Sequence, residues 1–301
     1  MSYPLVEIIN MLDETFNIRE HIGKDTSFVK RISDYFNNHL ISRFEHGFVG
    51  NCNGPMILGS ALIERIYGAT FLSDGTLVEL IKQNPENSLL IVHHPLDIEG
   101  GINDLDFIGY RAVSSNLLLS YIEKGGNVYS LHLPLDVNKY EINTHSAFLK
   151  YLSLQHNEIS PLLTINNHEY GYMLNIEATP TEDIIDLIDK RCPRYLQYGA
   201  SIDATKITRI GLLAGMISSL EQLRQIENID CDLCICGDLF IRDGSKRYLD
   251  LHRAVSESNT SFICLSHNIS EYQVFDYGLF PLLNSLFPKL DCHGLLGTLF
   301  R

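Results

Sequence analysis

The chain has 301 residues, of which 45% are hydrophobic, and it carries a formal net charge of −14. This apolar fraction is too high for a disordered chain, and the length allows one large core or two of ordinary size, of which we expect two. The acidic balance and the lack of a long basic run argue against nucleic-acid binding, because phosphate recognition depends mainly on Lys and Arg. An acidic field favours cations instead.

The sequence also indicates where the protein works. The first 16 residues lack a basic region followed by a purely apolar stretch, and no segment approaches about 20 uninterrupted apolar residues. The seven cysteines form no short disulfide framework, and an odd number favours reduced thiols. We therefore expect a cytoplasmic protein with no membrane partner.

The predicted elements begin with helices in residues 1–45, an N-terminal extension in which apolar residues recur at helical spacing. From there strands and helices alternate. Strands are predicted at 88–94 and from 127, with a helix at 114–126 between them. The segment 179–190 predicts a helix with a capping box from Thr179 to Glu182 and Pro180 at its first position. Strands and helices then alternate from residue 207 to residue 287.

This alternation predicts an α/β fold of two linked lobes, with mixed sheets covered by helices. We expect a first lobe made of residues 46–137 plus 260–301 and a second lobe made of residues 138–259. The segment CDLCICGD, residues 231–238, offers a CxxC pair, yet the later cysteines stand alone. A structural zinc site needs a second pair, so we predict a buried strand here.

Polar side chains follow the predicted strands. His93 and His94 end one strand, His132 ends another, and Asp238 and His267 follow two more. Because sites in open α/β sheets gather outside the carboxyl ends of strands, these residues are candidates for one site. Pro95 ends the strand after His94, so the two imidazoles are able to spread around a shared centre. Metal binding and simple hydrogen bonding at a strand end both fit this pair.

Two further motifs are candidates for the same site, although each is weaker evidence when taken alone. In HLPLD, residues 132–136, Pro134 argues against a helix, so we predict an extended exit that carries His132 and Asp136 to one edge, although Asp136 could equally cap the next element. His267 and Glu271 are four residues apart where a strand passes into a helix. In a helix they share one face about 5–6 Å apart, which suits chelation of a metal ion or a surface ion pair.

Together, VHHPL, NVYSLHLPLDV and CGDLF with SHNISE resemble the signatures of the NIF-three-like family, which includes the type 2 homologues of GTP cyclohydrolase 1. The resemblance covers roughly residues 50–290. It implies two α/β lobes with a dinuclear metal site in the cleft between them, assembled into a toroidal hexamer. Carried over by motif, the ligands of two divalent ions, zinc or iron, are His93, His94, Asp136, His267 and Glu271. Glu271 bridges the ions, and His132 is the catalytic residue beside them.

The chain also departs from this family. AGMISS, residues 214–219, stands where a Gly-rich turn is usual, and Cys236, Gly237 and Asp238 replace a Thr-Gly-Glu. PLDIEG replaces an aromatic residue near the double histidine. These departures put the substrate in doubt while the ligand set is intact.

Three functions follow from this reading. The first is a metal-dependent hydrolase that, by resemblance, opens the purine ring of GTP, with His132 handling protons. The second is a carrier of iron or zinc, and the third is a regulatory scaffold whose metals fix the cleft. A triphosphate needs cationic anchors, but there is no Walker-type loop, and Lys124, Lys206 and Arg209 are scattered. The metal site is therefore better supported than a nucleotide substrate.

Overall fold

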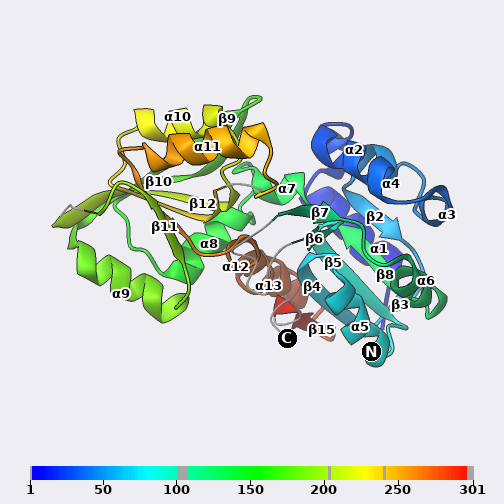
Figure 1. Cartoon of the computed structure of the whole chain (residues 1–301). Coiled ribbons are helices and arrows are strands. Elements are labelled where there is room, and N and C mark those ends of the chain that lie inside the picture. The colour runs from blue at the N-terminus through cyan, green and yellow to red at the C-terminus, as the bar shows by residue number, and fades with distance from the viewer. Residues whose placement is uncertain (1, 100–107, 203–204, 240–241, 297–301) are drawn as a thin grey trace. The chain divides into compact units, whose positions relative to one another are not determined.

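The computed structural model describes residues 2–99, 108–202, 205–239 and 242–296 (Figure 1). The chain divides into two compact units. Unit 1 comprises Met1–Glu99, Tyr110–Leu135 and Gly278–Arg301, and unit 2 comprises Gly100–Gly109 and Asp136–Tyr277. Each unit contains a mixed sheet with helices packed on it, so the α/β class predicted from the alternating pattern is confirmed.

Unit 1 is built on a five-stranded sheet in the order β15-β4-β5-β8-β2. The strands are β15 (Asp291–Gly294), β4 (Arg65–Phe71), β5 (Ser88–His94), β8 (Asn127–Ser130) and β2 (Gly54–Ile57). The first four run parallel, and β2 pairs antiparallel with β8. Strand β5 is central and every residue in it is buried, which explains its uninterrupted apolar run. It ends at His94, immediately before Pro95, as predicted.

The helices of unit 1 follow the expected order. Two of them, α5 (Asp74–Lys82) and α6 (Ser115–Glu123), connect parallel strands of the sheet. The N-terminal part of the chain forms α1 (Leu5–Thr15), the 3₁₀ turn Ile18–His21, α2 (Thr26–Tyr35) and α3 (Asn38–Ile41), followed by α4 (Phe48–Asn51). Leu5, Ile8 and Leu12 are buried on one face of α1. Helix α13 (Phe280–Leu286) precedes β15.

Unit 2 contains a six-stranded sheet in the order β11-β14-β13-β12-β10-β9. Its strands are β9 (Glu158–Ile165), β10 (His168–Pro180), β11 (Leu196–Gly199), β12 (Lys206–Met216), β13 (Leu233–Asp238) and β14 (Ser261–Cys264). Strands β12, β13 and β14 are parallel, and the remaining pairs are antiparallel. The carboxyl ends of the parallel strands therefore meet at one edge of the sheet.

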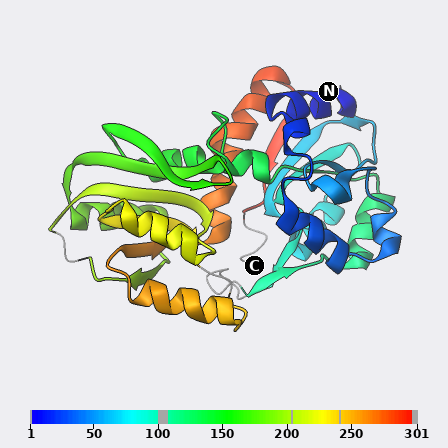
Figure 2. The same ribbon diagram turned by 90° about the horizontal axis from the view of Figure 1, so that it is seen from above.

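Helices cover both faces of this sheet. Side chains of α8 (Thr144–Leu152) and α9 (Thr181–Arg191) share one apolar core with the sheet, and Ile269 of α12 (His267–Val274) packs against that core. The opposite core includes residues of α10 (Leu220–Asn228) and α11 (Lys246–Ser256), which lie over the sheet in the view from above (Figure 2). On β12, Leu212 faces the first core and Leu213 the second, as strand alternation requires.

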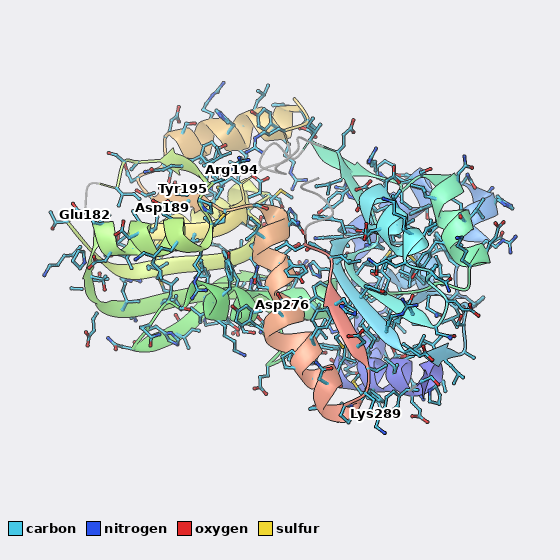
Figure 3. The ribbon with its side chains drawn as sticks, turned by 90° about the horizontal axis from the view of Figure 1, so that it is seen from below. Glu182, Asp189, Arg194, Tyr195, Asp276 and Lys289 are labelled. Carbon is cyan, nitrogen blue, oxygen red and sulfur yellow. The ribbon has the colours of Figure 1, made fainter. Side chains whose placement is uncertain are left out.

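The remaining elements are short. The pairs β1 (Tyr3–Pro4) with β3 (Leu62–Ile63), and β6 (Asp97–Glu99) with β7 (Gly109–Arg111), form two-stranded sheets. A π-helical segment, Phe275–Leu279, lies between α12 and α13, and Figure 3 labels Asp276 within it. No helix among the described residues is long and apolar enough to cross a membrane.

Two local predictions are wrong. Leu133–Asp136 forms the short helix α7 rather than an extended exit. Pro134 fits there because proline fixes a helical φ and its missing N–H falls in the first turn. The predicted capping box from Thr179 is also absent, since Pro180 occupies the cap position of α9 without a side-chain cap and the Thr179 hydroxyl donates to the Glu177 carbonyl. Thr179 lies in β10, where pairing with Ile207 overrides the local signal.

Candidate metal centre

Three histidines of unit 1 lie together at the carboxyl edge of its sheet. His93 and His94 end β5, and His132 follows its parallel neighbour β8. One ring nitrogen from each lies within 4.8 Å of the others. His93 and His94 are 0% and 2% exposed, and the side chain of His132 is 12% exposed. Such a group is able to converge on one metal ion.

The hydrogen bond of His93 identifies its ligand nitrogen. Its Nδ1 lies 3.0 Å from the carbonyl oxygen of Leu131. Because a carbonyl can only accept, Nδ1 carries the proton and donates, and the lone pair of the neutral ring is on Nε2. A backbone carbonyl on the second nitrogen is the usual partner of a metal-binding histidine, because it fixes both tautomer and ring orientation.

His94 is held by aromatic rings on both sides. Its ring stacks on Phe71 with centroids 4.8 Å apart and planes 11° apart, and on Phe28 at 5.4 Å and 27°. Its centroid is 4.4 Å from that of His93. Phe28 belongs to α2, so an aromatic side chain that the local motif lacks reaches the double histidine from a distant segment. The sequence analysis missed this residue because nothing near it indicates the contact.

His132 is fixed at two points. Its backbone N–H donates to Asn53 Oδ1 at 2.8 Å, and its ring Nδ1 lies 2.6 Å from Asp25 Oδ2. A carboxylate accepts, so Nδ1–H donates and the lone pair is on Nε2, as in His93. Nearby Cys52 is no thiolate ligand, since burial, reinforced by the charge of Asp25, raises the pKa of its thiol.

In unit 2, His267 and Glu271 form the predicted pair on α12. The helix begins at His267, where the Ser266 side chain accepts from the backbone N–H of Ile269. One helical turn brings His267 Nε2 to 3.1 Å from Glu271 Oε1, with both side chains buried. The pair is therefore not a solvated surface ion pair, and a buried carboxylate next to an imidazole is a suitable donor set for a metal ion.

Two glycines make room for this pair. A Cβ at Gly215, at the end of β12, would overlap Oε1 of Glu271, and Gly215 has a φ of +75° that other residues rarely adopt. A Cβ at Gly237, on β13, would overlap the hydroxyl of Ser270. That hydroxyl accepts from the backbone N–H of Gly215 at 3.0 Å. The AGMISS and CGD segments thus supply the glycines that seat α12 on the sheet.

Asp136 is the last residue of α7 and the first of the second segment of unit 2. Its carbonyl accepts from His145 Nε2 at 2.7 Å, while His145 Nδ1 accepts from the backbone N–H of Ala214 at 3.0 Å. Both ring nitrogens of His145 are engaged, so this histidine positions Asp136 against β12. In the sequence His145 follows no predicted strand and stands next to no other histidine or acidic residue, so no local pattern marks it.

The remaining candidates are structural. Cys234 and Cys236 are buried on β13, where burial raises the pKa of both thiols, and Cys236 Sγ is 3.6 Å from Cys264 Sγ. The buried strand predicted in place of a zinc knuckle is confirmed. Asp238 accepts from the backbone N–H of Leu239 and is paired with Arg242 at 3.5 Å, so its charge is compensated locally.

Comparisons with known proteins identify the family and the fold of the chain. The sequence matches the Duf34/NIF3 (NGG1p interacting factor 3) family over residues 29–293. Among solved structures, the chain is similar to reduced HcgD from Methanocaldococcus jannaschii, with a TM-score of 0.61, 15% identity and coverage of 98% of both chains. No curated protein gives a significant sequence match.

Two bacterial proteins are similar to a comparable degree. The Staphylococcus aureus hypothetical protein SA1388 gives a TM-score of 0.60 at 17% identity, with 97% of this chain and 96% of that chain covered. TTHA1606 from Thermus thermophilus gives 0.58 at 17% identity, with coverage of 97% and 98%. At these identities the likeness establishes the fold.

Proposed function

We propose that this chain, which belongs to the Duf34/NIF3 family, binds two divalent metal ions and acts as a metal-dependent hydrolase. The observation that carries the proposal is the buried group of His93 and His94, the first two proposed ligands, with His132 beside them; one ring nitrogen of each lies within 4.8 Å of the others. In two of these rings a hydrogen bond on Nδ1 fixes the orientation and leaves the lone pair on Nε2, which is the usual arrangement of a metal-binding histidine. Metal binding therefore accounts for this convergence of buried imidazoles.

The donor set fits a transition metal. Imidazole and carboxylate ligands together suit zinc and iron, whereas calcium and magnesium prefer oxygen alone. We assign the ions to five ligands, namely His93, His94, Asp136, His267 and Glu271, with Glu271 as the bridge. Assembly as a homo-hexamer and a cytoplasmic location stay predictions.

When bound, two such ions supply a Lewis acid and lower the pKa of water. The protein's own contribution is positional. His93 and His94 present fixed rings, His145 holds the backbone of Asp136, and His132 carries a lone pair on Nε2 that is able to accept a proton from the attacking water and return it to the leaving group. His132 is therefore the proposed catalytic residue.

The substrate is the less supported part. Opening the purine ring of GTP would need anchors for a triphosphate, and none of the three scattered cations serves. Lys124 and Lys206 are exposed, and Arg209 lies 3.9 Å from the fully exposed carboxylate of Asp230. We therefore propose hydrolysis of a small molecule whose identity is open, with GTP as the family-based candidate.

Reconstituted protein is expected to hold close to two zinc or iron equivalents per chain and to show at most modest GTP hydrolysis. Elemental analysis gives the stoichiometry, and a side-by-side assay measures GTP ring opening and metal transfer to an apo-acceptor. His132→Ala should keep the ions and reduce turnover about 10²-fold or more, because general acid–base catalysis contributes at least that factor. Glu271→Ala should lose the ions and both activities.

The matched control is His46→Ala, which removes an exposed histidine of the same unit. Failure of reconstituted protein to retain any metal would refute the site. Fast metal transfer without turnover, unchanged in His132→Ala, would replace the hydrolase by a carrier. Robust GTP turnover that His132→Ala abolishes would instead establish the nucleotide as substrate.

Removing the metals should lower the melting temperature by several degrees. The proposed ligands are far apart in the sequence, so we expect the ions to bind only the folded chain and to stabilise it by mass action, by about 2.7 kcal/mol when the free metal is 100 times its Kd. Thermal melting with and without a chelator measures the shift, and re-addition of zinc should reverse it. An unchanged melting temperature after verified metal loss would exclude this stabilising role.

A further inference from the structure

The N-terminal end of α2 reaches the histidine group through one buried carboxylate. Asp25, which is 5% exposed, lies 107 residues before His132 in the sequence. Its Oδ2 accepts from His132 Nδ1 at 2.6 Å, a short distance typical of a charge-assisted hydrogen bond. Three residues later Phe28 packs on the same imidazole, with centroids 4.3 Å apart. The N-terminal end of α2 therefore supplies both a hydrogen-bond partner and an aromatic packing contact for His132.

The side chain of Asp25 bonds His132 and does not cap the helix that follows it. It occupies the N-cap position of α2, where an aspartate side chain commonly accepts from backbone N–H groups of the first turn. Here the side chain makes no such capping bond, while the Asp25 carbonyl still accepts from the backbone N–H of Val29. The helix could be capped by the same carboxylate, so its engagement with His132 points to a requirement outside the helix.

Asp25 and Phe28 also lie just before residue 29, where the family match begins. The matched sequence, which includes all four histidines and both carboxylates of the proposed centre, therefore does not point to this contact, and only the structure brings it to light.

We propose that Asp25 is the positioning residue of His132. Its carboxylate holds the proton on Nδ1 and keeps the lone pair on Nε2, the nitrogen needed to accept a proton. An imidazole without this partner is free to populate the opposite tautomer, in which Nε2 carries the proton and cannot act as a base. The inference rests on the proposed function for the identity of the proton transfer, and the tautomer itself is measurable without any metal.

The test replaces Asp25 by asparagine and, separately, by serine. Both residues are good N-caps, so α2 keeps its start while the carboxylate is lost. Asp34→Asn is the matched control, because it removes an exposed carboxylate from the same helix. Long-range nitrogen–proton NMR of the metal-free protein, at a pH above the histidine titration range, reports the tautomer of each ring. Zinc affinity is measured by titration for each variant, and kcat and KM are measured where turnover is detected.

We expect Nδ1–H on His132 in the wild type and in Asp34→Asn, and a clear population of Nε2–H in both Asp25 variants. With metals bound, kcat should fall about 10²-fold with KM unchanged. An unaltered tautomer in a folded Asp25→Asn or Asp25→Ser protein would overturn the proposal. If the wild type binds no metal, the hydrolase fails, while a shifted tautomer still supports Asp25 as the positioning residue.

Discussion

Replacing Glu271 by glutamine should remove both metal ions, whereas His93→Ala or His94→Ala should remove mainly one. Glu271 is 4% exposed and is the ligand proposed to bridge the ions. Glutamine keeps the size and one oxygen but loses the charge that a bridging ligand needs. Loss of a hydrogen-bond partner of a ligand typically lowers metal affinity about 10–100-fold. Loss of the bridging charge itself should lower the metal affinity by more than this. Zinc titration of metal-free protein and elemental analysis measure both effects.

The control for this variant is Glu182→Gln. Glu182 is exposed in the first turn of α9 of the same unit, where Figure 3 labels it, and it has no role in the proposed centre. It should bind two equivalents with unchanged affinity. Equal metal retention in Glu271→Gln, His93→Ala and His94→Ala would contradict the assignment of Glu271 as the bridge.

The sequence predicts those parts of the protein whose causes are local. Strand β5 could be predicted to the residue because its apolar run and Pro95 are adjacent in the chain. The approach of His267 to Glu271 follows from their spacing of four once α12 starts at His267. Cys234 and Cys236 could be placed in a buried strand because no second cysteine pair competes for them.

Other features depend on partners far away in the chain. Asp25 bonds His132, 107 positions away, and His145 accepts from Ala214, 69 positions away, and neither residue belongs to a repeated or recognisable pattern. The start of α9 differs from the prediction because ladder pairing extends β10 as far as Pro180. Pro134 likewise argues against a helix only in its interior, and α7 is a single turn. The error at α9 thus arises from a long-range contact, whereas the error at α7 arises because proline is compatible with the first turn of a helix.

The AGMISS segment, residues 214–219, contributes a glycine next to the proposed centre. Gly215 stands at the end of β12 with φ at +75°, next to the carboxylate of Glu271. The neighbouring Ala214 donates its backbone N–H to His145 at 3.0 Å, which ties this turn to Asp136 as well. Gly215 therefore lies against the proposed ligand Glu271. Its neighbour Ala214 bonds His145, the histidine that positions Asp136.

Gly215→Ala should abolish high-affinity metal binding, while Gly244→Ala should leave it intact. Both glycines have left-handed backbones, with φ of +75° and +70°, so each alanine carries a similar strain of about 1–2 kcal/mol. Only at position 215 would the new Cβ overlap Glu271 Oε1, whereas a Cβ at Gly244 meets no atom within 4 Å. The pair separates backbone strain from displacement of the ligand.

Thermal melting and zinc titration of the two variants measure these effects. Both proteins should melt a few degrees below the wild type in the metal-free state, since strain of this size lowers the melting temperature by about 2–4 °C per kcal/mol in chains of 150–250 residues. Zinc should then raise the melting temperature of Gly244→Ala as in the wild type and leave Gly215→Ala unchanged. Wild-type zinc affinity in Gly215→Ala would mean that the carboxylate of Glu271 tolerates displacement, and its role as the bridging ligand would have to be abandoned.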